Sequence, residues 1–367
     1  MALFIVTSSA GMQSVYGASG YQLILAKSRE LASSVPHAKF YALDDGFLMG
    51  QLAAAKDNTA PSLSAALGQL TRIPPAPNNS ERSILILGDH RIFPYFEVPN
   101  PVQDRIDPDP NVLTDNPYGS GGSQNPGDWL RPDLLPVGRI AAGVSDSAQD
   151  FCKLLDVQIS LRKTRPIRAG YVEVTSRQWQ NTSAFVMSAL ASPKRVYVSP
   201  DDRIAAPNAS NLDCKFLYCN LHGFLNQSAW QGFDPGTGSY VPALTPDAFA
   251  AQYLQGSIVF SEACYGLQTQ GRNTSSSCAL SLLAAGAAVV GSTGLAFGSS
   301  TPQPQTLIDA DALARGFFNQ SLQPKATLGS CLQAARLSLR QSAPTLDAYL
   351  RKTLLEFQLL GDPSYAI

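Results

Sequence analysis

Short apolar runs and longer amphipathic stretches alternate along the first 90 residues. The runs 2–9, 38–45 and 83–89 are short and apolar, as expected for strands, whereas 21–35 and 61–73 carry apolar residues at helical spacing. The run 83–89, SILILGD, is continuously apolar, which is typical of a strand covered on both faces. This alternation predicts a parallel sheet with helices on its faces.

Residues 92–136 break the pattern, because they are rich in Pro, Gly, Asn and Asp. We expect a long loop there, anchored by aromatic residues such as Tyr118 and Trp129, and loops of this length inside a compact chain are often functional. Order is predicted to return with a strand at 136–140 and a helix over 145–163, followed by a domain boundary near 165.

The alternation resumes in the second half of the chain. Strands are predicted at 169–176, 195–199, 214–220, 257–263 and 287–292, with helices between them, and three helical segments are expected to close the chain. We therefore predict an α/β protein of two parts. A smaller α/β domain covers 1–165 and includes the loop 92–136, and a parallel-sheet domain with helices on both faces covers 166–367.

Composition excludes several classes of protein. Of the 367 residues, 44% are hydrophobic and 15% are charged, which suffices for a packed core and is unlike a disordered chain. The net charge of −1 gives no sign of nucleic-acid binding, and no apolar run is long enough for a membrane helix. Six cysteines are too sparse for a disulfide scaffold, and the first residues, MALFIVTSS, resemble a strand more than a secretion signal. We expect a reduced, cytoplasmic protein.

Two of the predicted strands end in residues that can carry chemistry. The run KFLYCNLHGF places His222 after one strand, and SIVFSEACYG places Cys264 after the next. Ligands of parallel α/β sheets bind at the carboxyl ends of strands, and neighbouring strands lie about 4.8 Å apart. A thiolate is a nucleophile, and an imidazole can generate it and then protonate a leaving amine. We predict that His222 and Cys264 form a catalytic pair.

Neighbouring residues extend this site. Gly223 lets the backbone come close to a substrate, and its N–H, together with that of Cys264, is a candidate donor to an oxyanion. Glu262 precedes the cysteine by two residues, so strand alternation points it to the same face, where it is a candidate for binding a substrate amine.

An apolar strand with His-Gly followed by an apolar strand with Glu-Ala-Cys resembles the caspase-like cysteine peptidases. TDNPYG at 114–119, PVGRI at 136–140, AAGAAVVGSTG at 284–294 and LLGDPS at 359–364 are similar in order to the gingipain branch of that group. The resemblance covers about residues 80–364 and implies a caspase-like α/β domain with cysteine endopeptidase activity. The absence of a leader departs from the secreted gingipains.

The resemblance also implies further site residues. An acidic residue from the region between the two parts orients the histidine in that family, and Asp115 matches it best; otherwise Asp115 caps a turn before Asn-Pro. Ser292 and Thr293, in GSTG, match a wall of the pocket for the residue before the scissile bond. The implied partner is a protein or peptide substrate, with an activating protein partner left open, and a role in defence or cell death is an analogy.

Several alternatives stay open on the sequence. The chain could be a catalytically silent, caspase-like scaffold that binds proteins. Cleavage after basic residues would need an acid such as Asp115 or Glu262 in the pocket, and cleavage after acidic ones an arginine such as Arg139 or Arg272.

Metal, cofactor and nucleotide sites find little support in the sequence. IDPDPN at 106–111 spaces Asp107, Asp109 and Asn111 like a calcium loop but lacks its Gly and Glu, so we expect neither a metal nor a cofactor. His90, after the run 83–89, is a minor candidate for lining the crevice. No phosphate-binding loop follows the first strand.

Overall fold

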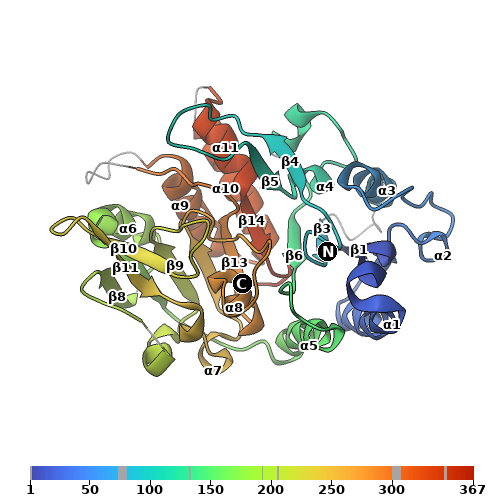
Figure 1. Ribbon diagram of the computed structural model, residues 1–367, viewed down its shortest axis with the longest axis horizontal. Helices are drawn as coiled ribbons and strands as arrows, with labels where there is room; N and C mark the ends of the chain where they lie inside the picture. The colour runs from blue at the N-terminus through green and yellow to red at the C-terminus, as the bar shows by residue number, and fades with distance from the viewer. Residues whose placement is uncertain are drawn as a thin grey trace.

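The computed structural model describes residues 2–72, 81–131, 134–191, 193–204, 206–299, 307–342 and 345–367. Within these ranges, ten strands form one sheet in the order β2-β1-β3-β6-β14-β13-β12-β9-β7-β8 (Figure 1). The strands are β1 (Ala2–Thr7), β2 (Ala38–Ala42), β3 (Arg82–Leu87), β6 (Val137–Ile140), β7 (Tyr171–Ser176), β8 (Pro193–Ser199), β9 (Phe216–Asn220), β12 (Ile258–Ser261), β13 (Ala288–Ser292) and β14 (Phe357–Leu360).

Strand β14 divides the sheet into two sets of strands that run in opposite directions. It pairs in parallel with β6 and antiparallel with β13, while the strands within each set pair in parallel. The carboxyl ends of β1, β3 and β6 therefore lie at one edge of the sheet, and those of β13, β12, β9 and β7 lie at the other. The sequence pattern predicts only helices at the end of the chain, because a run of four residues, FQLL, directly after a helix is too short to show a distinct period of its own.

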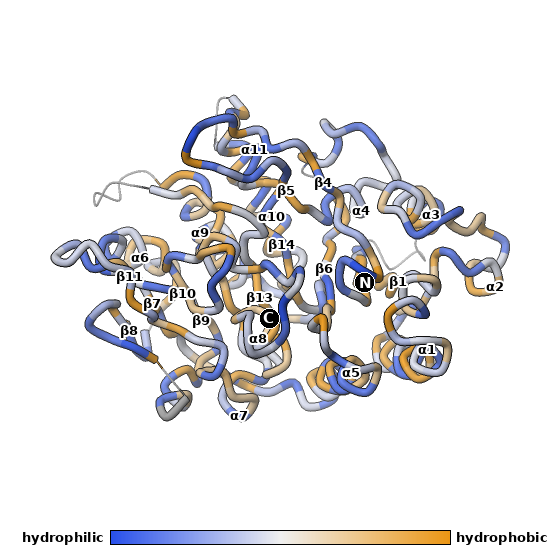
Figure 2. Tube along the Cα trace, in the orientation of Figure 1, coloured by the Kyte–Doolittle hydropathy of each residue, from blue (hydrophilic) through white to orange (hydrophobic). Residues whose placement is uncertain are grey.

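Helices cover both faces of the sheet, as predicted. Alternate residues of β9 face opposite ways, so that Leu217 and Cys219 join the core with α1, α5 and α8, whereas Phe216 and Tyr218 join the core with α6, α9, α10 and α11. Figure 2 shows hydrophobic residues along the central strands and on the sides of the helices that face them. The helices are α1 (Ser9–Ser34), α2 (Gly46–Met49), α3 (Ala60–Arg72), α4 (Asn116–Gly119), α5 (Ala148–Thr164), α6 (Gln180–Met187), α7 (Ala251–Leu254), α8 (Cys278–Ala284), α9 (Asp309–Ser321), α10 (Leu328–Ser342) and α11 (Ala348–Glu356).

The predicted loop 92–136 is more regular than its composition indicates. It contains an antiparallel ribbon of β4 (Phe96–Pro99) and β5 (Asn111–Thr114), the helix α4 and the 3₁₀ helix η1 (Pro126–Leu130). The ring of Phe96 lies 5.1 Å from that of Tyr118 and 5.4 Å from that of Trp129, which confirms that aromatic residues anchor the segment. Residues 132–133 lie outside the described part of the chain.

The mostly parallel sheet with helices on both faces confirms the predicted fold class. The chain passes from one set of strands to the other between α5 and β7, next to the predicted boundary at 165. Because β14 joins strands of both halves, the two parts share one sheet, and their division into separate domains stays a prediction. A hairpin of β10 (Trp230–Asp234) and β11 (Ser239–Leu244) follows β9 outside the main sheet.

No helix in the described ranges is long and apolar enough to cross a membrane.

Candidate active site

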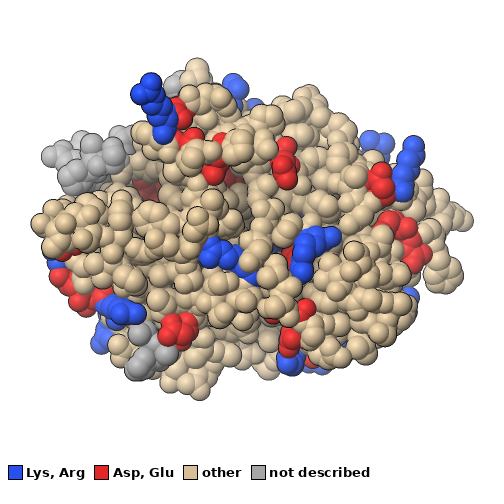
Figure 3. Space-filling view, in the orientation of Figure 1, with Lys and Arg blue, Asp and Glu red and all other residues tan. Residues whose placement is uncertain are grey.

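The two strand ends predicted to carry chemistry are adjacent. Strands β9 and β12 pair in parallel, so both leave the sheet at the same edge. A Cβ at Gly223 would lie 1.8 Å from the carbonyl oxygen of Cys264, so the two loops touch only because residue 223 is glycine. His222 and Cys264 line one open cavity of about 790 Å³. Figure 3 shows this face of the molecule hollowed between the region of the β10–β11 hairpin and that of the β4–β5 loop.

The thiol of Cys264 is the one cysteine side chain on this cavity. Its Sγ lies 3.6 Å from the carbonyl oxygen of Ala296, to which it donates a weak hydrogen bond. Burial raises the pKa of Cys264 to about 11, and the charge of Glu356 adds to this, while nearby N–H groups and Lys352 act in the opposite direction. The cysteine is therefore a neutral thiol at neutral pH.

Hydrogen bonds hold His222 at its backbone and at one nitrogen of its imidazole ring. Its N–H donates to the carbonyl of Gln231 at 2.7 Å, and its carbonyl accepts from the N–H of Gln231 at 2.8 Å, so the β10–β11 hairpin fixes the backbone. The Nε2 atom lies 2.7 Å from Nε2 of Gln178, in the 3₁₀ helix η2 (Arg177–Trp179) that follows β7. In this arrangement the amide nitrogen faces the ring, so Nε2 accepts and the ring proton sits on Nδ1; a half-turn of the amide would reverse the tautomer.

Aromatic rings surround the imidazole of His222. Trp179 packs on it at 4.3 Å between ring centroids, and Tyr240 meets it edge-on at 4.8 Å. The rings of Phe233 and Phe224 also lie near the imidazole, with centroids 6.1 and 6.5 Å from its own. Burial among these rings lowers the pKa of His222 to about 4, because the rings give the imidazolium no water to solvate it. The histidine is therefore neutral, and ready to accept a proton, across the neutral range.

Two carboxyl groups form the floor of the cavity. Glu262 accepts a hydrogen bond from the hydroxyl of Tyr218 at 2.6 Å, and Asp311, at the start of α9, accepts one from the N–H of Ser299 at 2.5 Å. A Cβ at Gly298 would lie 2.7 Å from Oδ2 of Asp311 and 3.7 Å from Oε2 of Glu262, so glycine leaves both acids open. Burial and the charge of Asp311 raise the pKa of Glu262 well above its usual range. Burial raises the pKa of Asp311 as well, while its hydrogen bonds with Ser299 and Glu262 oppose the shift, so of the two acids Glu262 binds a proton more strongly.

The predicted oxyanion donors, the N–H groups of Gly223 and Cys264, both lie on the cavity. Within the described residues, the N–H groups of Gly223 and Cys264 donate to no backbone or side-chain oxygen. Both belong to the two loops that touch at the cavity, and their role as oxyanion donors stays a prediction.

The structure does not bring Asp115 to His222. Both carboxylate oxygens of Asp115 accept hydrogen bonds from the guanidinium of Arg139, at 2.6 and 2.9 Å, and both side chains are buried. Arg139 also donates to the carbonyl oxygens of Gly88 and Phe93. Asp115 and Arg139 are paired with each other, and neither is among the described residues that line the cavity.

Three further candidates also lie elsewhere than expected. The hydroxyl of Ser292 donates to the carbonyl of Gly294, and that of Thr293 donates to the carbonyl of Leu113. Both side chains face into the protein, and the wall of the cavity is formed by the residues that follow, 295–299. His90 follows β3, whose carboxyl end lies at the opposite edge because β14 reverses the strand direction.

Of the candidate specificity residues, Glu262 lines the cavity, and Arg272 forms hydrogen bonds with a loop at its edge. The guanidinium of Arg272 donates to the backbone carbonyls of Leu225 and Gln227, which lie on the loop after His222. The structure adds Gln178 and Asp311, which sequence reasoning missed. The position of Gln178 directly after the strand at 169–176 was the one available signal.

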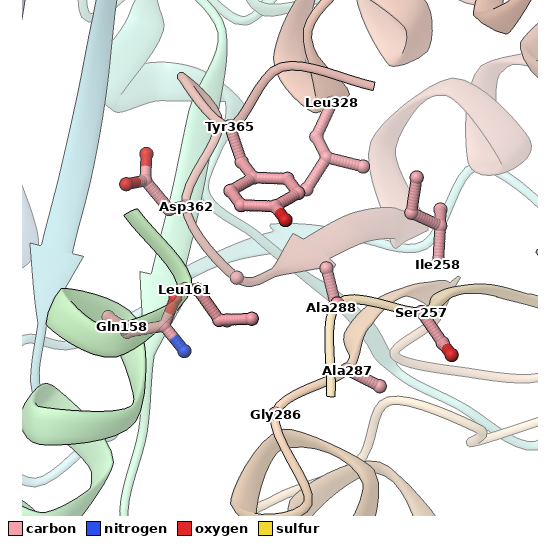
Figure 4. A pocket seen from close by; sticks show the side chains of 12 residues that line it. Gln158, Leu161, Ser257, Ile258, Gly286, Ala287, Ala288, Leu328, Asp362 and Tyr365 are labelled. Carbon is pink, nitrogen blue, oxygen red and sulfur yellow. The ribbon is translucent and has the colours of Figure 1, made fainter. Parts of the chain in front are cut away.

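A second, much smaller cavity lies at the opposite edge of the sheet, between α5 and the amino ends of β12 and β13 (Figure 4). Its volume is about 10 Å³, enough for about one water molecule. Leu161, Ala287 and Leu328 line it, and no cysteine or histidine is among its described lining residues. It is not a candidate for catalysis.

Comparisons with known proteins identify the family and the fold of the chain. The model of peptidase family C25 matches residues 71–367. The solved structure of gingipain R (RgpB), an Arg-specific cysteine proteinase, is similar at 12% identity and a TM-score of 0.62, over 100% of this chain and 78% of that one. A complex of the pro- and mature domains of Porphyromonas gingivalis RgpB is similar at 11% identity and a TM-score of 0.60, over 100% and 80%.

A further solved structure, described as a protease, is similar at 13% identity and a TM-score of 0.63, over 100% of this chain and 78% of that one. A search of curated proteins finds no match. At these identities the structural matches show a shared fold, and the family model shows the family.

Proposed function

The chain belongs to peptidase family C25 and is a cysteine-type peptidase, and we propose that it is an endopeptidase that cleaves proteins with a Cys264–His222 dyad. The observation that carries the proposal is the contact of Gly223 with the carbonyl of Cys264. This contact puts the side chains of His222 and Cys264 on one cavity. Each group stands at the end of a rigid strand, as catalytic geometry requires.

The proposed reaction proceeds through an acyl-enzyme. As Sγ of Cys264 attacks the carbonyl carbon, Nδ1 of His222 accepts the thiol proton, and the carbonyl oxygen takes up the electron pair in front of the N–H groups of Gly223 and Cys264. The carbon–nitrogen bond then breaks, and the imidazolium gives its proton to the leaving amine. Water hydrolyses the thioester, with His222 first accepting a proton from the water and then returning it to the sulfur.

Gln178 supports the proposal as the group that orients the imidazole. With its amide oxygen facing Nε2, Gln178 accepts the Nε2 proton and leaves Nδ1 free as the base. With its amide nitrogen facing Nε2, the proton sits on Nδ1 instead. A half-turn of the amide therefore selects the tautomer of His222.

The cavity floor favours a basic substrate side chain before the scissile bond. A guanidinium or ammonium group would meet the charge of Asp311 and displace the proton of Glu262. Gingipain R is described as Arg-specific, and this chain offers its own pair of acids for the same kind of residue. Asp115, buried on Arg139, takes no part.

The test uses purified wild type and Cys264→Ala on a peptide library that varies the residue before the scissile bond. We expect cleavage after Arg or Lys by the wild type and none by the variant. Asp311→Asn should lower kcat/KM for basic peptides by about 10²-fold, because a charge pair is lost in a desolvated site. Cleavage by Cys264→Ala would overturn the dyad, and binding without cleavage by the wild type would instead favour a silent scaffold.

The biological setting is a further part of the proposal. We propose a cytoplasmic enzyme, which the six free cysteines support. We also propose a role in regulated proteolysis of the defence or cell-death type, which rests on analogy with the family. An activating protein partner is also proposed. The complex of pro- and mature domains known for RgpB supports this by analogy.

A further inference from the structure

The loop 104–110, between β4 and β5, forms one rim of the catalytic cavity. Ile106 and Pro108 both line the cavity, although they precede the nucleophile by more than 150 residues. The side chain of Ile106 is 70% exposed, and it stands beside other apolar residues on the cavity. Leu295 and Phe297 line the cavity as well and continue this apolar surface.

The backbone of this loop is fixed by its own side chains. Oδ1 of Asp104 accepts hydrogen bonds from the N–H groups of Ile106 and Asp107, at 2.8 and 3.0 Å. Oδ1 of Asp107 accepts one from the N–H of Asp109 at 3.0 Å. Ile106 is thus presented on a rigid turn, so its exposure is a property of the folded loop.

A buried lysine fastens the loop to α11. Nζ of Lys352 forms an ion pair with Asp107, and neither side chain is exposed to solvent. It also lies 3.7 Å from Asp109 and 3.8 Å from Glu356. A buried charge is tolerated only where a partner of opposite sign is held against it, so Lys352 and the loop depend on each other. The amino group of Lys352 thus lies beside Asp107 and Asp109, two of the residues whose spacing resembles a calcium loop.

Asp109 connects the same loop to the nucleophile. Its Oδ1 accepts a hydrogen bond from the hydroxyl of Tyr265 at 2.9 Å, and its Oδ2 accepts one from the N–H of Leu295 at 3.0 Å. Tyr265 follows Cys264 and has a φ of 54°, a conformation that needs such support. Moving the loop would therefore also disturb the turn that carries the thiol.

The position of the loop decides which part of a substrate it meets. His222, which protonates the leaving amine, stands at the end of β9, whereas the loop 104–110 contacts Leu295 beyond the end of β13. Cys264, at the end of β12, lies between them. The loop therefore lies on the acyl side of the scissile bond.

We propose that the loop 104–110 binds the substrate, and we call it the lip. In the lip, Ile106 and Pro108 select an apolar residue on the acyl side of the scissile bond, and the ion pair of Lys352 with Asp107 holds them in place. This inference rests on the proposed endopeptidase function. It adds an apolar subsite to the acidic floor.

The experiment compares wild type, Ile106→Ala and Asp107→Asn on peptides with Arg at the cleavage point and Leu or Gly beside it on the acyl side. Wild type should prefer Leu, and Ile106→Ala should reduce the Leu-to-Gly ratio of kcat/KM by about 5- to 10-fold, since a few apolar carbons are lost. Asp107→Asn should reduce the ratio likewise with Ile106 intact. It should also speed hydrogen exchange at the N–H groups of 106–109.

Ile167→Ala is the matched control, because Ile167 is an exposed isoleucine that does not line the cavity. It should leave both the rate and the ratio unchanged. Peptide cleavage with the same ratio in every variant would overturn the lip and leave the endopeptidase intact. Failure of the wild type to cleave any peptide would overturn the proposed function, and the lip with it.

Discussion

Gly223 and Cys264 meet so closely that a side-chain carbon on residue 223 would lie 1.8 Å from the cysteine carbonyl oxygen. We expect Gly223→Ala to push the two strand ends apart and lower kcat/KM by about 10²-fold, the usual cost of a misplacement of about 1 Å. Circular dichroism should show a folded protein. Gly46→Ala, where an added carbon meets nothing within 4 Å, is the control and should keep full activity. Wild-type activity in Gly223→Ala would show that the site is elsewhere.

On the acid side, the rate of cleavage should begin to fall only at an unusually low pH. Since burial lowers the pKa of His222 to about 4, the base stays neutral and active down to that pH in the free enzyme. The measurement is kcat/KM against pH, and a limb near 6.5 would contradict a buried imidazole.

The lowered pKa of His222 also makes the stability of the protein depend on pH. The unfolded histidine binds a proton below about 6.5, so its contribution to stability is present above that pH and is lost as the pH falls toward about 4.

Alkylation of the resting enzyme checks the other half of the dyad. Burial raises the pKa of Cys264 to about 11, so the rate of reaction with iodoacetamide should keep rising with pH well above 9. Mass spectrometry of the peptide that contains Cys264 follows this site alone. A plateau already reached at neutral pH would mean a preformed thiolate, and the neutral resting dyad would be wrong.

Gln178 should matter for turnover more than for binding. We expect Gln178→Ala to lower kcat by about 10-fold with little change in KM, because the imidazole loses the group that selects its tautomer. Gln178→Glu should raise the pKa of His222, since a negative charge favours the imidazolium, and should move the acid limb upward. Gln323→Ala, at an exposed glutamine, is the control. An unmoved limb in Gln178→Glu would remove this contact from the mechanism.

Asp115 should affect stability, with no separate effect on the rate. Asp115→Asn leaves the buried guanidinium of Arg139 without its counter-charge, so we expect a loss of about 3–5 kcal/mol in the free energy of unfolding. Urea denaturation measures it, with Asp156→Asn at an exposed ion pair as the control, expected to cost about 0–1 kcal/mol. A fall in kcat at unchanged stability would restore Asp115 to the catalytic site.

The placement of His222 and Cys264 on one cavity was predictable because the signals that indicate it are local. Each residue directly follows an apolar run, and runs of that kind form neighbouring parallel strands whose ends meet. His222 and Cys264 thus followed from the order of elements alone. Glu262 followed from the two-residue period of a strand.

The other features of the site and the fold depend on contacts between distant parts of the chain, which a local pattern does not reveal. Asp311 joins Glu262 across 49 residues, and Lys352 joins Asp107 across 245. Strand β14 is four residues long and directly follows a helix, so neither its period nor its length marks it as a strand. Missing β14 also hid the reversal of strand direction, and therefore the reason why His90 lies away from the cavity.

The central place of β14 has a consequence for how the protein is made. Residues 357–360 are synthesised after the nine other strands of the described sheet, yet they lie between β6 and β13 and pair Leu360 with Arg139 across 221 residues. Until they emerge from the ribosome, two groups of strands exist without the strand that joins them, and the ends of both are open to wrong pairing. Glu356, whose backbone carbonyl accepts from the N–H of Thr293, arrives at the same moment. The cavity is therefore completed only after residues 356–360 have been synthesised, and a nascent chain that lacks them would be spared premature proteolysis by its own order of assembly.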